Sequence, residues 1–165
     1  MRRLALAVLP LAFLATACQP GTTELTEEQI TTIEAEVNAV ANEALAAIVA
    51  MDVDRHLNFY ANSHDLTVAV YGVVRRSFST WAELVRTGFS EMESVETCAF
   101  SDEVVQVLAA DVAVFTADFG CTGTAVGGGP LVGHTVTGVM VKRDGEWKCV
   151  NFSETFAPPE SSEDT

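Results

Sequence analysis

The sequence predicts an α+β domain whose helices lie on one side of an antiparallel sheet. Within its 165 residues, segments with helical periodicity come first, and β-rich runs separated by turn signals follow. This order of helices and then strands is typical of α+β domains, in which the sheet buries one face against the helices. The length suits a single domain with a sizeable core.

The first helix is predicted over residues 27–50. Thr26 and Gln29 have the spacing of a capping box, in which each side chain bonds the other residue's backbone N–H. Apolar residues then recur at three- and four-residue steps, which places them on one buried stripe: Ile30, Ile33, Val37, Val40, Ala44 and Ile48.

Two shorter helices are expected to follow. Asp52 can cap a helix whose apolar positions Val53, Leu57 and Tyr60 share one side. After a β-rich run over residues 66–74, the segment 80–83 reads as a second capping box. It would open a helix that ends near residue 93 and turns five apolar residues inward: Trp81, Leu84, Val85, Phe89 and Met92.

Residues 93–108 and 112–123 are predicted to form two strands joined by a tight turn. A turn centred near residues 109 and 110 places Cys98 opposite Cys121, and the same register pairs Phe100 with Phe119 and Val104 with Phe115. We therefore predict a disulfide between Cys98 and Cys121. Cys149 is left over and is expected to be a buried thiol.

A second hairpin is predicted from Asp144-Gly145, the pair that favours a two-residue type I′ turn. Counting from this turn pairs Val150 with Val139, Phe152 with Thr137, and Glu154 with Thr135. The opposite face would then carry a mixed set suited to a dimer contact or to solvent: His134, Met140, Trp147, Cys149, Asn151 and Ser153. The glycine run 127–129 marks another turn, and no Gly-Lys-Ser/Thr follows to suggest a phosphate cradle.

The N-terminal segment resembles a bacterial lipoprotein signal peptide. Arg2 and Arg3 precede an apolar run over residues 4–14, and Leu14-Ala15-Thr16-Ala17-Cys18 resembles a lipobox. The resemblance implies cleavage before Cys18, lipid attachment at Cys18, and export to the cell envelope on its periplasmic or extracellular face. The alternative is an ordinary signal cleaved after Ala17, which would leave a soluble secreted protein. The predicted organisation is a signal peptide (1–17), a lipidated tether (18–25), the folded domain (26–156) and a disordered acidic tail (157–165).

The charge balance limits the expected partners. The chain carries a formal net charge of −14, which disfavours nucleic acid and anionic lipid head groups. Membrane contact is therefore expected only through the lipid anchor. Neither a cofactor nor a metal is predicted, because His56, His64 and His134 lack the short spacing of zinc ligands.

Several short motifs, taken in order, resemble the NTF2-like superfamily, and most closely its SnoaL-like and DUF4440-type domains. They are Met51-Asp52, Phe59-Tyr60-Ala61, Asp65-Leu66-Thr67-Val68 and the run from Asp144 to Val150. The resemblance spans residues 27–156 and implies a cone: a strongly bent antiparallel sheet wrapped around about three N-terminal helices. It also implies an apolar pocket at the open end and frequent homodimers formed through the sheet face.

The resemblance also indicates where ketosteroid isomerases of this fold carry their catalytic groups. The tyrosine position falls on Ala44, the base falls near Val70, and the second aspartate position falls on Thr137 or Gly138. None of these side chains can perform those roles. Isomerase chemistry of that kind is therefore disfavoured.

Five residues are predicted to line the pocket: Tyr60, Trp81, Thr137, Phe152 and Glu154. Glu154 is the first candidate for a general base, because a carboxylate in an apolar mouth has a raised pKa. Asp118 is the second, although strand alternation places it opposite the apolar face.

Three classes of function remain open. The first is a lipid-anchored, non-catalytic domain that binds a small apolar molecule. The second is an acid–base enzyme of the cyclase, dehydratase or isomerase type that uses Glu154 or Asp118. The third is a protein-interaction or dimerisation module that uses the face with His134, Trp147 and Asn151.

Overall fold

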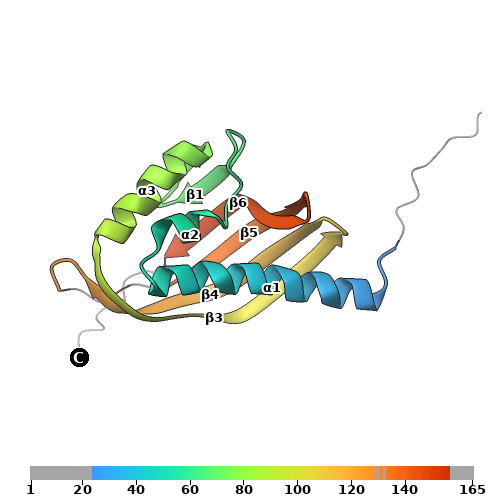
Figure 1. Cartoon of the computed structure of the whole chain (residues 1–165), viewed down its shortest axis with the longest axis horizontal. Helices are drawn as coiled ribbons and strands as arrows, with labels where there is room; N and C mark the ends of the chain where they lie inside the picture. Colours follow the sequence, from blue (N-terminus) through green and yellow to red (C-terminus); the bar gives the residue numbers. More distant parts are fainter. Residues whose placement is uncertain (1–23, 129–130, 132, 157–165) are drawn as a thin grey trace, which may run out of the picture.

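The computed structural model describes residues 24–128, 131 and 133–156. Within these ranges, three helices precede or interrupt one six-stranded sheet (Figure 1). The helices are α1 (Glu27–Val49), α2 (Val53–Leu57) and α3 (Phe78–Ser90), and the strands are β1 (Thr67–Val70), β2 (Val73–Arg76), β3 (Met92–Ala109), β4 (Val112–Ala125), β5 (His134–Arg143) and β6 (Glu146–Phe156). This is the predicted α+β class.

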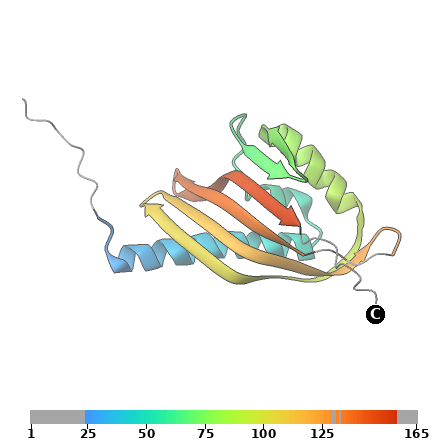
Figure 2. The same cartoon turned by 180° about the vertical axis from the view of Figure 1, so that it is seen from behind.

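The sheet has the strand order β2-β1-β6-β5-β4-β3. The β1–β6 pair is parallel, whereas the other neighbours are antiparallel. Seen from behind, the four long strands bend together and leave the sheet open (Figure 2).

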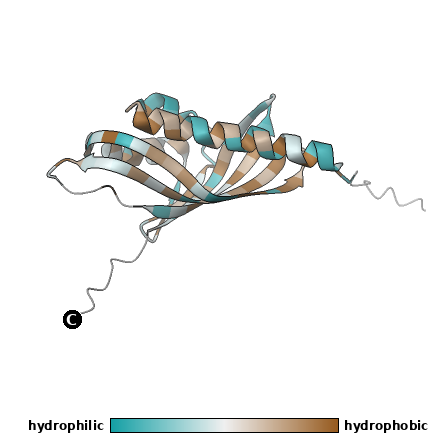
Figure 3. Ribbon diagram, turned by 90° about the horizontal axis from the view of Figure 1, so that it is seen from below, coloured by the Kyte–Doolittle hydropathy of each residue, from teal (hydrophilic) through white to brown (hydrophobic). Residues whose placement is uncertain are grey.

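All three helices cover the concave face of this sheet. The long helix α1 runs across β3 and β4, while α3 lies beside the short β1–β2 hairpin (Figure 1). Much of the sheet beneath α1 is hydrophobic, as the brown segments of Figure 3 show. The largest fully buried side chains lie in this layer: Val37, Leu66, Val68, Val70, Met140 and Cys149.

The expected capping box starts α1. The Thr26 hydroxyl accepts from the Gln29 N–H at 3.2 Å, and the Gln29 side chain accepts from the Thr26 N–H at 2.9 Å. Farther along α1, Glu36 accepts hydrogen bonds from Lys142 Nζ at 2.6 Å and from the Trp147 indole at 2.7 Å. These two bonds lower the Glu36 pKa and tie the helix to the β5–β6 hairpin.

Two helices differ from the prediction, because α2 ends at Leu57 and leaves out Tyr60, and α3 begins earlier than expected. α3 begins at Phe78 and is capped by Ser77, whose hydroxyl accepts from the Thr80 N–H. Thr80 therefore lies inside the first turn and is not the cap. Ser77 and Thr80 can both cap a helix. The bond from the Trp81 N–H to the Ser77 carbonyl oxygen shows that the helical pattern already begins at Ser77.

The β3–β4 hairpin contains the predicted disulfide. Cys98 lies opposite Cys121 and is bonded to it, and Phe100 lies opposite Phe119. Nearer the turn the predicted register is wrong, because a bulge between residues 101 and 104 contains Asp102 with a φ of 50°. Val104 consequently pairs with Thr116 in place of Phe115 and points to solvent.

A glycine permits a close approach at the far end of this hairpin. Gly123 has a φ of 154°, and a Cβ at this position would collide with the Ser94 carbonyl oxygen. The two strands can therefore remain paired beyond the disulfide.

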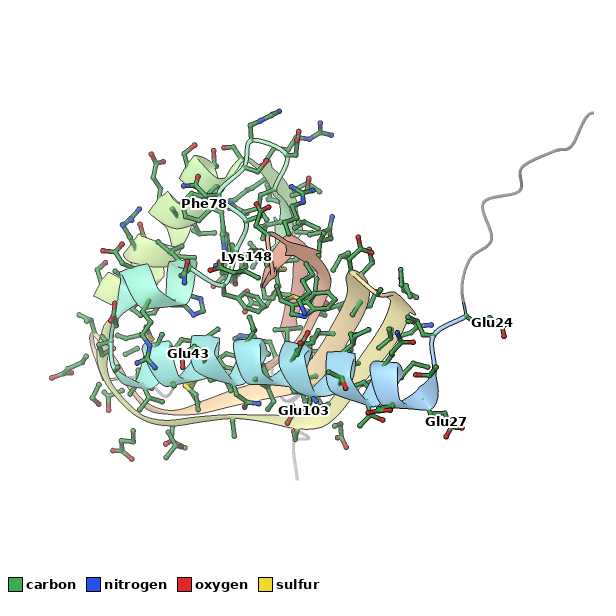
Figure 4. All side chains as sticks on the ribbon, turned by 45° about the vertical axis from the view of Figure 1, so that its right-hand side comes forward. Glu24, Glu27, Glu43, Phe78, Glu103 and Lys148 are labelled. Atoms are coloured by element: carbon green, nitrogen blue, oxygen red, sulfur yellow. A yellow bond between two sulfur atoms is a disulfide. The ribbon has the colours of Figure 1, made fainter. Side chains whose placement is uncertain are left out.

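The predicted signal peptide, the lipid site at Cys18 and the acidic tail from residue 157 lie outside the described residues. Glu24 and Glu27, labelled in Figure 4, mark where the described chain enters α1. None of the helices in the described ranges combines the length and the apolar composition that a membrane span requires.

Candidate functional site

A cavity of about 670 Å³ lies between the concave face of the sheet and the helices. Its wall draws residues from all three helices and from β3, β4, β5 and β6. Much of the wall is aromatic: Phe59, Tyr60, Trp81, Phe89, Phe119 and Phe152. A volume and lining of this kind suit a small, largely apolar molecule.

Four of the five residues predicted from the sequence line this cavity: Tyr60, Trp81, Phe152 and Glu154. The rings of Tyr60, Trp81 and Phe152 form a mutual cluster with centroid separations of 5.5 to 6.0 Å. Tyr60 follows α2, Trp81 lies on α3 and Phe152 lies on β6. The cluster therefore joins the helical side of the cavity to the sheet.

The polar centre of the wall is a pair formed by Glu154 and His134. Glu154 Oε1 lies 2.6 Å from His134 Nε2, and the two side chains are only 16% and 10% exposed. His134 starts β5, Glu154 lies near the end of the neighbouring strand β6, and the His134 ring packs on Phe119 with a centroid distance of 4.6 Å. A carboxylate held in this way has a fixed direction and a second oxygen that the bond to His134 does not use.

The negative charge of Glu154 acts on three other residues of the cavity. Burial is the main cause that raises the pKa of Tyr60 and of Tyr71, and Glu154 raises both further. The same charge favours the protonated form of His56. Glu154 therefore lies close enough to influence groups contributed by α2, by the segment after α2 and by the β1–β2 turn.

Tyr60 remains a neutral hydrogen-bond donor in this environment. Burial, Cys149 and Glu154 all raise its pKa, and the adjacent Trp81 opposes them only in part. A phenol that keeps its proton can donate to negative charge developing on a bound molecule.

His56 is a neutral residue of the same wall. Burial lowers its pKa, while a bond from Nδ1 to the Ala44 carbonyl oxygen at 3.1 Å and the charge of Glu154 oppose that effect. Its ring contacts Tyr60 and Phe89 at centroid distances of 5.8 and 5.5 Å.

Thr137 does not line the cavity, so this part of the prediction is wrong. The register counted from the Asp144-Gly145 turn holds as far as the Met140–Cys149 pair, where a bulge adds one residue, Val150, on β6. Beyond the bulge Gly138 pairs with Phe152 and Thr137 pairs with Ser153. The Thr137 hydroxyl instead meets that of Thr116 at 3.3 Å.

The same bulge reverses the faces expected for this hairpin. His134, Met140, Trp147 and Cys149 were expected on a dimer or solvent face, yet His134 lines the cavity and the other three are buried in the core. Asn151 is exposed and Ser153 is half-buried. The third functional class therefore loses the surface on which it was based.

Asp118, the second candidate base, lies away from the cavity. It is exposed on β4 and accepts a hydrogen bond from the Thr135 hydroxyl at 2.8 Å. Alternation along β4 explains this direction, since Ala117 and Phe119 on either side point inward.

The positions aligned with the isomerase groups lie mostly on the cavity wall. Ala44, Val70 and Gly138 line it, whereas Thr137 does not. Among the described residues, this cavity thus carries small or apolar side chains where those enzymes place their acids. Its carboxylates come from Glu154 on the last strand and from Glu91 at the end of α3.

Cys149 and the histidines do not form a metal centre. No group of three His, Cys, Asp or Glu side chains within the described ranges is arranged to hold an ion. Cys149 is fully buried, its Sγ donates to the Asn151 carbonyl oxygen, and burial raises its pKa. Such a thiol is protonated and unreactive.

Sequence reasoning missed His56, Tyr71, Glu91 and His134 as cavity residues. His56 carried a usable signal, since it lies three residues after Val53 on α2, on the same side of a helix that packs against α1. His134 would have followed from the β5 alternation alone, because it shares a face with Val136 and Gly138.

The bent open sheet, the helices on its concave side and the apolar cavity between them define the NTF2-like fold. The chain belongs to the SnoaL-like family, because the SnoaL-like domain model matches residues 37–157. A search of curated protein sequences found no match.

Similar solved structures agree on the fold. A protein of unknown function from Mycobacterium tuberculosis is 17% identical, with a TM-score of 0.67 over 85% of this chain and 80% of that one. A proposed scytalone dehydratase from Novosphingobium aromaticivorans is 8% identical, with a TM-score of 0.71 over 81% and 89%. A hexachlorocyclohexane dehydrochlorinase is 16% identical, with a TM-score of 0.66 over 82% and 100%.

Proposed function

We propose that this protein is an acid–base enzyme that acts on a small, uncharged and largely apolar molecule held in the cavity. Glu154 is the general base, and His134 is the residue that positions it. The observation that carries this proposal is the short Glu154–His134 contact, which lies almost fully buried in the wall of an aromatic cavity.

The reaction begins with proton transfer from a carbon atom to Glu154. The free carboxylate oxygen takes the proton, and the electron pair of the broken C–H bond moves into the substrate. There it forms a double bond as a leaving group departs with its own bonding pair, or it forms an enolate on an adjacent carbonyl. The Tyr60 hydroxyl, which burial keeps protonated, donates to the negative charge that develops.

The charge of the wall selects the substrate class. Among the described residues that line the cavity, Glu91 and Glu154 are acidic and none is lysine or arginine. An anionic substrate would meet two carboxylates and no counter-ion, whereas an uncharged ring system would meet aromatic faces.

Two similar structures support eliminations as the reaction type. A dehydratase removes water and a dehydrochlorinase removes hydrogen chloride, so each reaction takes a proton and a leaving group from its substrate. An elimination of this kind needs the proton removal that Glu154 is proposed to perform.

A direct test measures proton removal without the natural substrate. The ketone 2-tetralone is uncharged, bicyclic and has acidic C–H bonds beside its carbonyl. We expect the wild-type protein to accelerate deuterium incorporation from D₂O, measured by NMR, and Glu154→Gln to reduce that rate by about 10²-fold or more.

Asp118→Asn is the matched control, because it removes the other candidate carboxylate from the outer face. It should exchange at the wild-type rate. Equal rates for the wild type and Glu154→Gln would overturn the assignment of the base.

The second candidate function is non-catalytic binding of a small apolar molecule, the leading hypothesis from the sequence. Its support is the cavity itself, whose volume and aromatic cluster need no proton transfer to be useful. Native mass spectrometry of protein purified from its own host would show a retained ligand. A retained ligand together with no deuterium exchange on 2-tetralone would favour this function over catalysis.

We also propose that the domain acts outside the cytoplasm, anchored by lipid on Cys18. The Cys98–Cys121 disulfide supports export, because disulfides persist mainly in oxidising compartments. Mass spectrometry of the mature N-terminus should find diacylglycerol on Cys18. An unmodified N-terminus would indicate soluble secretion.

A further inference from the structure

A tyrosine occupies a turn position that side chains rarely adopt. Tyr71 and Gly72 form the two-residue turn between β1 and β2, with φ values of 54° and 71°. Two positive φ values define a type I′ turn, which favours Asn, Asp or Gly at its first position. The β5–β6 turn has the same form with the favoured residue, since Asp144 and Gly145 have φ values of 53° and 85°. The turn itself therefore does not explain a tyrosine at residue 71.

Tyr71 also belongs to the cavity wall. It lines the cavity from the β1–β2 turn while remaining 65% exposed, and the neighbouring Val73 is exposed as well. Partial burial, Glu154 and Glu91 all raise the Tyr71 pKa, and Arg75 opposes them. The ring thus lies at the mouth, within the influence of both carboxylates of the wall. By contrast, Tyr60, the other tyrosine that lines the cavity, is only 4% exposed.

We propose that Tyr71 is a specificity-determining residue that contacts the bound molecule at the mouth of the cavity. Its ring covers the outer end of the ligand, and its hydroxyl donates to an acceptor group there. This inference rests on the proposed ligand cavity. Contact with an apolar ligand would bury ring surface that is now exposed, which offsets the strained backbone that the turn requires.

The test measures two effects of each variant separately: thermal stability, which reports on the turn, and affinity for the uncharged fluorescent probe 1-aminoanthracene, which reports on the ligand contact. Tyr71→Asn gives the turn its favoured Asn-Gly sequence, so we expect the Tm to rise by about 2–4 °C. The same change should weaken probe binding roughly tenfold. Tyr71→Phe keeps the ring and the strain, and should leave the Tm unchanged with a smaller loss of affinity.

Asp144→Tyr is the matched control, because it places a tyrosine in the other type I′ turn, outside the lining of the cavity. It should lower the Tm and leave probe affinity unchanged. Probe affinity unchanged in Tyr71→Asn would overturn the proposal, and so would equal losses in Tyr71→Asn and Asp144→Tyr.

A further variant shows whether a negative result concerns the role of Tyr71 alone or the proposal that the cavity binds a ligand. Trp81→Ala opens the aromatic cluster and should weaken probe binding. If Trp81→Ala weakens binding and Tyr71→Asn does not, only the role of Tyr71 fails. If the wild-type protein does not bind the probe, the ligand cavity fails together with this inference.

Discussion

At the scale of single residues, burial decides which protonation state the cavity histidine His56 adopts. Its ring lies between Tyr60 and Phe89, and burial lowers its pKa below the ordinary value of 6.5. The unfolded chain therefore binds a proton on this residue at a higher pH than the folded protein does. Folding is linked to release of that proton in the interval between the two pKa values.

The sign of this linkage gives a prediction for stability. Above pH 6.5 both states carry neutral His56, and the free energy of unfolding is greatest with respect to this group. As the pH falls below 6.5 the unfolded state gains the proton first, so the free energy of unfolding decreases. Urea unfolding of wild-type protein at pH 7 and at pH 5.5 should show this decrease, and His56→Gln should show a smaller one.

His64→Gln is the control for that prediction. His64 is exposed and contacts only the exposed Asp65 in the ion pairs of the described residues. Its removal should leave the wild-type pH dependence intact. If His64→Gln and His56→Gln flatten the dependence equally, burial of His56 is not its cause.

Single residues also show what the sequence could and could not predict of the site. Helical periodicity places Trp81 correctly, and the aromatic and carboxylate positions of the last strand place Phe152 and Glu154 at the cavity. The register counted from the turn places His134 on the outer face, whereas it lines the cavity. Its identity was visible in the sequence, but its partner Glu154 follows only from a strand pairing that includes the bulge.

At the scale of elements, the β5–β6 hairpin shows the limit of counting from a turn. Asp144-Gly145 predicts the turn and the first pairs correctly, up to Met140 with Cys149. The bulge at Val150 then places two successive residues opposite one, and every later pair shifts. Bulges depend on how the strand bends around the helices, which the local sequence does not encode in a recognisable signal.

Adjacent lysine substitutions on β5 test this register. Val136 is buried on the cavity side, whereas Thr137 lies on the outer face beside Thr116. Thr137→Lys should change the free energy of unfolding by no more than about 1 kcal/mol. Val136→Lys replaces a buried side chain of the cavity wall, opposite Glu154 on β6, with a longer and charged one, and should cost several kcal/mol or prevent folding.

Chemical denaturation followed by circular dichroism measures both variants. Under the register counted from the turn alone, Thr137 would face Phe152 in the pocket, so Thr137→Lys would be the damaging change. That result would contradict the bulge.

At the scale of the whole molecule, the residues themselves predict the order of helices and strands, whereas the bent sheet and its cavity were expected only from the resemblance to the NTF2-like superfamily. Helix periodicity and turn residues gave most elements within a few positions, but the β-rich run 66–74 is divided into β1 and β2 by the turn at Tyr71 and Gly72. The cavity arises where α1, α3 and the far ends of β3 and β4 meet, and the sequence separation between those parts is large. The disulfide is the one covalent link across this region in the described residues.

This link should stabilise both the fold and the cavity. Cys98 and Cys121 are 23 residues apart, and closing a loop of this length in the unfolded chain corresponds to about 3 kcal/mol. Cys121 lines the cavity, and Phe100 and Phe119 beside the bond line it too. Replacing both cysteines with serine should therefore lower the free energy of unfolding by about this amount and weaken 1-aminoanthracene binding.

Reduction provides the matched control for that double variant. Dithiothreitol should shift the urea midpoint of the wild-type protein to that of Cys98→Ser/Cys121→Ser and leave the midpoint of the variant unchanged. Cys149 cannot account for such a shift, because it is a buried free thiol in both proteins. Coincident midpoints of oxidised wild type and variant would contradict a stabilising role. Equal probe affinity in the two proteins would mean that β3 and β4 hold the cavity wall without the bond, through strand pairing alone.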